Sequence, residues 1–148
     1  MNPSCRALEF RIPPEGVGAG SAWERFFEFL YARYHLNLAA SGRFVHAFEL
    51  VNEPNWQLWP QRAPSGTDDP LATAPLTVQH TMAQQMATAR AVAARHGDTT
   101  LLLAPSTADA ENPARNVTRY DEFAPALLDA LEGIGHTPGP MEAWAHHN

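Results

Sequence analysis

The distribution of hydrophobic and polar positions alternates between a helical period and short apolar runs. Apolar side chains recur at helical spacing in three stretches, which predicts helices over Ala22 to His35, Thr77 to His96 and Tyr120 to Glu132. Apolar runs beside them predict strands over Phe44 to Glu53, Thr99 to Ala104 and Met141 to Asn148. This alternation is typical of an α/β fold with parallel strands and right-handed connections.

Each predicted helix has an apolar face that we expect to pack on the sheet. On the first helix this face consists of Trp23, Phe26, Phe27, Leu30, Tyr31 and Tyr34. On the second it consists of Val78, Met82, Gln85, Met86, Ala89, Val92 and Ala93, and on the third of Phe123, Leu127, Leu128 and Leu131. Ser21 and Glu24 have the spacing of a capping box, and Gly97 is suited to end the second helix.

The candidate chemistry lies where the first predicted strand ends, at Asn52-Glu53-Pro54. Pro54 cannot donate to a strand ladder, so we expect the strand to stop there and a loop to follow. That loop begins with Trp56 and Trp59, whose indoles can stack on a sugar ring or simply pack the loop onto the fold. Glu49 and Glu53 have the same parity, so an unbroken strand would direct both to one side.

The run Phe48-Glu49-Leu50-Val51-Asn52-Glu53-Pro54 resembles the fourth-strand signature of the clan A glycoside hydrolases. The resemblance implies a retaining (β/α)8 barrel, a TIM barrel, in which Glu53 is the catalytic acid/base and Asn52 binds the 2-hydroxyl of the sugar. The chain would then hold approximately strands four to six with flanking helices. A histidine faces the sugar at the end of the family's sixth strand, and His147 is the match, with His146 as the alternative.

The chain length conflicts with a complete barrel. A (β/α)8 barrel typically needs about 250 residues, whereas this chain has 148. The family's nucleophile is a second glutamate on the seventh strand, and Glu49 cannot replace it because four residues of strand span about 13 Å. We therefore interpret residues 1–148 as a fragment of one catalytic domain, with 1–20 as an irregular lead-in. Such a fragment is expected to be inactive alone and to self-associate through exposed sheet edges.

Weaker candidates follow the second predicted strand, where Ser106, Thr107 and Asp109 serve either as substrate contacts or as turn and cap residues. No metal or other cofactor is expected, since the adjacent His146 and His147 would point to opposite faces of a strand. The resemblance implies that the ligand is a carbohydrate.

Charge and hydropathy limit the classes of partner that we expect for this chain. The formal net charge is −6 with no basic patch, which argues against nucleic acid. No stretch is long enough to span a membrane, and no signal peptide is visible, so a cytoplasmic protein is expected if Met1 is the true start.

The alternative functions are carbohydrate binding without cleavage or a degenerate barrel remnant. A flavodoxin-like domain ranks last because no glycine-rich phosphate loop follows a strand.

Overall fold

The computed structural model describes residues 17–39, 41–55, 78–97, 100–107, 119–140 and 142–145. Helices and strands alternate along the chain, which confirms the α/β class. The elements are α2 (Ala22–Tyr31), the π-helical turn η2 (Ala32–Leu36), α3 (Asn37–Ala39), β1 (Ala47–Glu49), α4 (Val78–Arg95), β2 (Leu101–Ala104), α5 (Tyr120–Gly133) and β3 (Glu142–Trp144).

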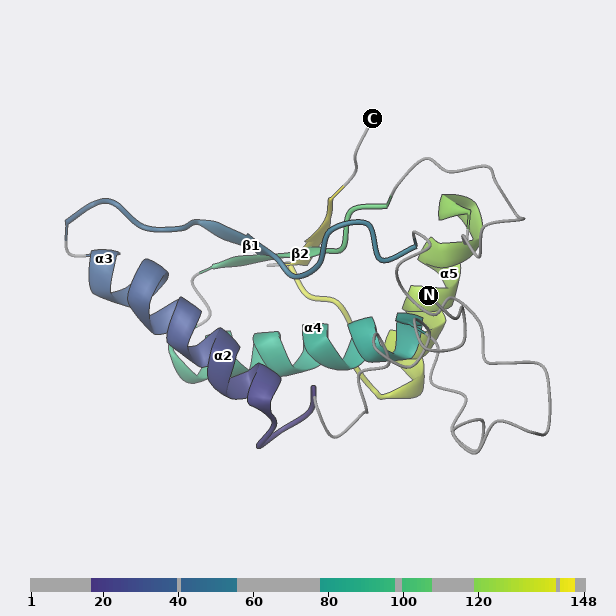
Figure 1. The fold of residues 1–148 in the computed structure, drawn as a ribbon, viewed down its shortest axis with the longest axis horizontal. Helices are drawn as coiled ribbons and strands as arrows, with labels where there is room; N and C mark the ends of the chain where they lie inside the picture. The colour runs from purple at the N-terminus through teal and green to yellow at the C-terminus, as the bar shows by residue number, and fades with distance from the viewer. Residues whose placement is uncertain are drawn as a thin grey trace, which may run out of the picture.

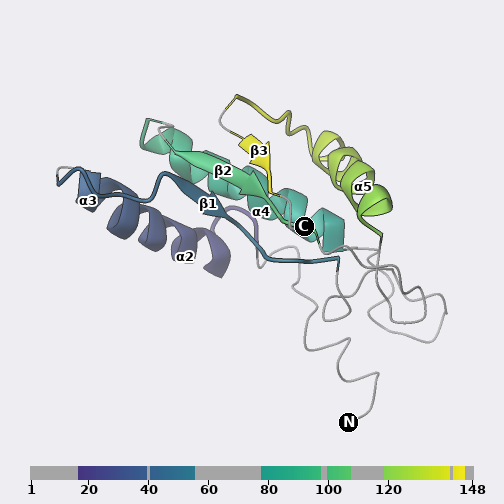
Figure 2. The same cartoon turned by 90° about the horizontal axis from the view of Figure 1, so that it is seen from above.

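The described strands form a small parallel sheet in which β1, β2 and β3 lie side by side in chain order (Figure 2). The register pairs Phe48 with Leu102 and Leu102 with Glu142. All three strands are shorter than predicted, and the described residues form an open sheet rather than a closed barrel. In this part of the chain β1 and β3 pair with β2 and with no other strand.

Helices α2 and α4 lie beneath the sheet in Figure 1, and α5 packs beside α4. Leu102 and Ala104 of β2 are buried against these helices, whereas Leu101 and Leu103 on the alternate face are only half-buried. Among the described residues, helices cover one face of the sheet. Alternate side chains of a strand point to opposite faces, so Leu102 and Ala104 face the helices while Leu101 and Leu103 face away from them.

Helix α4 is central because it contributes to both hydrophobic clusters. In one cluster, Ala89, Val92 and Ala93 of α4 meet Phe27 and Tyr31 of α2 and Leu102 of β2, with Phe48 packed at its margin. In the other, Val78, Met82, Ala83 and Met86 meet Phe123, Leu127, Ala130 and Leu131 of α5. The predicted apolar face of α4 is therefore confirmed.

The predicted faces of the other two helices are partly wrong. Phe27 and Tyr31 of α2 are buried as expected, but Phe26 is 53% exposed and Tyr34 is 41% exposed. On α5, Leu128 is 51% exposed and Ala130 is buried in its place. Helical spacing does not determine whether a residue at the edge of an apolar stripe is buried. The position of the neighbouring helix determines its burial.

The helix ends follow their sequence signals. Ser21 Oγ accepts from the Glu24 backbone N–H at 3.0 Å, while Glu24 reaches back to the Gly20 N–H instead of that of Ser21. Helix α4 ends before Gly97, which has φ +94°, as predicted. The π-helical turn was not predicted. Within it, the ring of buried His35 contacts the Val45 carbonyl oxygen at 2.7 Å and ties this turn to the segment leading into β1.

Candidate functional site

The candidate site lies at the carboxyl ends of β1 and β2, where the ladder is interrupted and then resumes. The regular pairing of Ala47 with Leu101 and Glu49 with Leu103 stops after these strands. An isolated parallel bridge then joins Asn52 to Ser106 in the same register. Pro105 lies in this interval, and the absence of a backbone N–H at proline explains why the ladder does not run through it.

At this interruption, Ser106 is hydrogen-bonded to the side chain of Glu49. One carboxylate oxygen of Glu49, Oε1, accepts from the Ser106 backbone N–H at 3.1 Å and also from the Ser106 hydroxyl. The Ser106 Oγ lies 3.2 Å from the Asn52 Oδ1. The Glu49 carboxylate thus accepts both donors of Ser106, and these contacts place Glu49, Asn52 and Ser106 in one hydrogen-bonded cluster.

Glu53 adopts a backbone conformation that no strand contains. Its φ is +47°, and no other non-glycine residue in the described part of the chain has a positive φ. Its backbone N–H donates to the Ser106 carbonyl oxygen at 2.9 Å. The strand is therefore not unbroken between Glu49 and Glu53, because β1 ends at Glu49 and Glu53 has a left-handed backbone conformation.

The candidate site contains both buried residues and residues that are accessible to solvent. Ser106 and Asn55 are fully buried, Thr107 is nearly so, and Pro54 is also buried. Asn52 is exposed and Glu53 is half-buried. Buried neighbours on both sides of an exposed amide and a half-exposed carboxyl group hold these groups in place while leaving them open to a ligand.

The structure locates two of the five predicted site residues. Asn52 and Glu53 lie side by side at the end of β1, beside Ser106. Trp56, Trp59 and His147 lie outside the described residues, as do His146 and Asp109. Sequence reasoning missed the contact of Glu49 with Ser106. The signals that predict it are the parallel register of the two strands and the proline that interrupts one of them.

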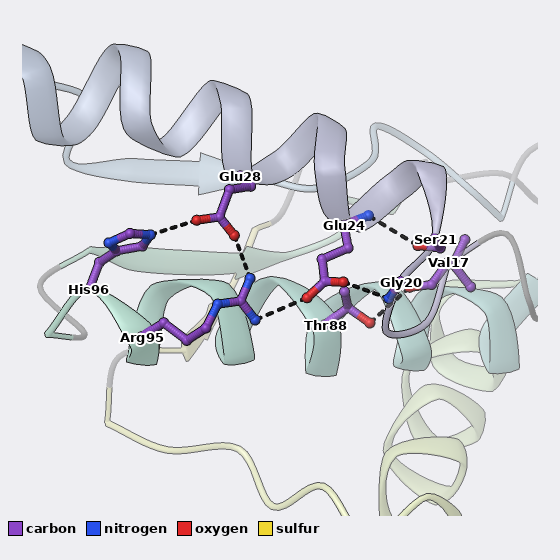
Figure 3. A network of polar contacts seen from close by, with 8 residues as sticks. All are labelled: Val17, Gly20, Ser21, Glu24, Glu28, Thr88, Arg95 and His96. Atoms are coloured by element: carbon purple, nitrogen blue, oxygen red, sulfur yellow. Dashed lines mark hydrogen bonds and ion pairs between the residues drawn. The ribbon is translucent and has the colours of Figure 1, made fainter.

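A second polar cluster joins α2 to α4 (Figure 3). Arg95 on α4 pairs with Glu24 at 2.9 Å and with Glu28, and His96 contacts Glu28 at 2.7 Å. The hydrogen bond from His96, followed by that from Arg95, lowers the pKa of Glu28. The Gly20 N–H, followed by Arg95, lowers the pKa of Glu24. The charges complement one another, so this cluster fits a structural clamp between two helices.

The described ranges contain neither a candidate metal-binding cluster nor a candidate membrane-spanning helix. No group of three or more His, Cys, Asp or Glu side chains comes together there in an arrangement suited to a metal ion. None of the described helices is long and apolar enough to cross a membrane.

Comparison with known proteins adds no family assignment, since no family model, no curated protein and no solved structure matches this chain.

Proposed function

We propose that this chain carries the acid/base portion of a retaining glycoside hydrolase built on a (β/α)8 barrel. In this proposal Glu53 is the general acid/base, Asn52 binds the 2-hydroxyl, and Trp56, Trp59 and His147 contact the sugar. The observation that carries it is the position of Asn52-Glu53-Pro54 at the carboxyl end of β1, directly beside the end of the parallel strand β2. Barrel enzymes build their active sites at this edge of the sheet.

The topology of the sheet is compatible with a barrel segment. The strands follow one another in chain order, without the reversal at which doubly wound folds bind their ligands. Helices α2 and α4 lie on the same side, and Glu49 and Leu103 occupy the face that no described helix covers. In a barrel, helices form the outer ring and the opposite face of the sheet is turned inward.

The mechanism assigns two successive proton transfers to Glu53. As an acid, Glu53 protonates the glycosidic oxygen while a carboxylate on the other side of the sugar attacks the anomeric carbon. As a base, it then removes a proton from the water that releases the sugar. Glu49 does not fit the role of nucleophile, because its carboxylate is engaged by the backbone and hydroxyl of Ser106. The proposal places the nucleophile on the seventh strand of the family's barrel.

The test compares Glu53→Ala with wild type in the protein produced from the complete reading frame around this chain. Aryl glycosides with good leaving groups need no acid, so their glycosylation step should be nearly unchanged in the variant. Poor leaving groups should be hydrolysed at least about a hundredfold more slowly, and added azide should restore turnover of the good ones. Stopped-flow and steady-state release of the aryl group measure both steps.

Glu122→Ala, which removes an exposed glutamate from the first turn of α5, is the matched control. Its rates should equal those of wild type. If Glu53→Ala hydrolyses poor leaving groups at the wild-type rate, Glu53 is not the acid/base. If the wild-type protein binds oligosaccharides in calorimetry but cleaves no glycoside, the alternative of carbohydrate binding without cleavage replaces the enzyme proposal.

A further inference from the structure

We propose that Glu49 and Ser106 are positioning residues that hold the Asn52 side-chain amide in one orientation, with its NH₂ toward Ser106 and its carbonyl oxygen toward the ligand. The orientation follows from the hydrogen-bond inventory of three side chains. Its role in recognising a sugar hydroxyl rests on the function proposed above, whereas the orientation itself does not.

The inventory begins with the single hydrogen of the Ser106 hydroxyl. Two oxygens face Ser106 Oγ, one from the Glu49 carboxylate and the other assigned as Asn52 Oδ1 at 3.2 Å. One hydrogen cannot serve both acceptors, and a carboxylate is the stronger of the two. The hydroxyl therefore donates to Glu49, and the Asn52 atom facing Ser106 must be a donor.

Only one end of an amide can donate. The oxygen and nitrogen of an asparagine side chain exchange places by a half-turn about the last torsion, with almost no change in shape. With that turn, Asn52 Nδ2 donates to Ser106 Oγ, while the Ser106 hydroxyl and N–H both donate to Glu49. The Asn52 carbonyl oxygen then points away from the cluster, on a residue that is exposed.

Ser106, the central residue of this cluster, is held by backbone hydrogen bonds. Ser106 is fully buried and bridges Asn52 through the parallel pairing, and its carbonyl oxygen accepts from the Glu53 N–H at 2.9 Å. Its own N–H is held by Glu49 at 3.1 Å. Since neither side of Ser106 can shift, its hydroxyl is a rigid reference for the amide.

The orientation specifies which ligand group Asn52 selects. An outward carbonyl oxygen accepts a hydrogen bond and cannot give one, so the complementary ligand group is a donor such as a sugar hydroxyl. In the proposed enzyme this is the hydroxyl next to the anomeric carbon, whose contact strengthens in the transition state.

The functional experiment measures kcat/KM for matched aryl glycosides with a 2-hydroxyl and with a 2-deoxy group, using the full reading frame. Ser106→Ala and Glu49→Leu should lower the ratio of the two values by about tenfold, because the amide is no longer held toward the hydroxyl. Their kcat/KM on the 2-deoxy substrate should stay within about twofold of wild type. A merely structural defect would lower both values together and leave the ratio unchanged.

Two control variants separate positioning from general damage. Glu49→Gln retains a carbonyl oxygen that accepts from both Ser106 groups, so it should keep the wild-type ratio. Thr100→Val removes a fully buried hydroxyl at the opposite end of the same strand, where Thr100 Oγ1 donates to the His46 carbonyl oxygen at 3.0 Å. It should also keep the ratio. An unchanged ratio in Ser106→Ala would overturn the positioning role.

A second measurement is independent of any enzymatic activity. Nuclear magnetic resonance of the ¹⁵N-labelled chain should show Asn52 NH₂ protons close to the Ser106 β protons. In Ser106→Ala the NH₂ group loses its acceptor, so its proton resonances should shift and exchange with water faster. NH₂ protons that face solvent in wild type would overturn the orientation. If the orientation is observed but the wild-type protein cleaves no glycoside, the proposed function fails while the orienting role of Glu49 and Ser106 stands.

Discussion

At the scale of single residues, the notable feature is that a catalytic candidate occupies a strained backbone position. Glu53 has φ +47°, a region in which a Cβ atom crowds the neighbouring carbonyl oxygen. Its N–H is nevertheless held by the Ser106 carbonyl oxygen, and buried Pro54 follows it. A conformation that is kept despite its strain is common at functional sites, where it directs a side chain that a regular strand would place elsewhere.

This strain predicts an order of stability among three variants of Glu53. Each of Glu53→Gly, Glu53→Asn and Glu53→Val removes the carboxylate, so differences between them report the backbone. Glycine and asparagine accept positive φ readily, whereas a β-branched side chain does not. We expect Val to be less stable than Gly and Asn by about 1–2 kcal/mol in urea denaturation. Equal stability of all three variants would show that the left-handed conformation is absent in solution.

At the scale of elements, α5 packs on α4 through the hydrophobic cluster that includes Met82, Phe123 and Leu127. Leu127 on α5 is fully buried against α4, while its neighbour Leu128 is 51% exposed. Adjacent positions on one helix therefore offer a matched pair with identical chemistry and opposite environments.

We expect Leu127→Ala to lower the free energy of unfolding by about 2–4 kcal/mol, because it removes buried methyl groups and leaves a cavity. Leu128→Ala should change it by less than about 0.5 kcal/mol. Chemical denaturation of the two variants measures this difference. Similar losses in both variants would contradict the packing of α5 described above.

The clamp between α2 and α4 makes the docking of these helices sensitive to acid. The pKa values of Glu24 and Glu28 lie below their ordinary value of 4.5 in the folded chain. Carboxyl groups with lowered pKa stabilise the fold above the unfolded pKa, and this contribution is lost as the pH falls through the folded pKa.

Wild type should therefore lose stability as the pH is lowered from about 6 to about 3, and Arg95→Ala should lose less over the same interval. Arg95 is the second cause of both shifts, after the Gly20 N–H for Glu24 and His96 for Glu28, so its removal reduces the difference between the folded and unfolded pKa values. Thermal unfolding across this pH range measures the effect. Added salt should weaken it in wild type because the pairs are partly exposed. Parallel curves for the two proteins would assign the acid sensitivity to other groups.

At the scale of the whole molecule, the sheet has surfaces that a partner can cover. The face carrying Leu101 and Leu103 lies opposite α2 and α4, and no described element covers it. In the described part of the chain, the outer edges of β1 and β3 also have no strand partner. Open edges and apolar faces promote association between copies.

We therefore predict that the isolated chain associates with increasing concentration, which sedimentation velocity between about 10 and about 100 μM will show. Leu103→Lys places a charge on the uncovered face and should reduce association. Leu128→Lys, on the outer side of α5, is the control and should have little effect. A sharp monomer boundary for wild type at every concentration would argue against an unpartnered barrel segment.

The alternation of elements and the faces of α4 were predictable because they depend on local periodicity and end signals. The helix face of Val78, Met82 and Ala89 is buried as its spacing indicates, and Gly97 follows the helix end. These features are encoded within a few residues of where they appear. The proline after Glu53 predicted a later strand end than the structure has, since β1 stops at Glu49 and only an isolated bridge at Asn52 follows.

The tertiary structure alone decided what depends on residues far apart in the chain. Glu49 meets Ser106 because two parallel strands share a register that Pro105 interrupts, and local patterns carry no register between distant strands. The exposure of Phe26 and Leu128 depends on where neighbouring helices lie, and the left-handed turn at Glu53 is fixed by its bond to Ser106. The sequence thus determined which side chains are available, and the pairing of strands determined how they are held.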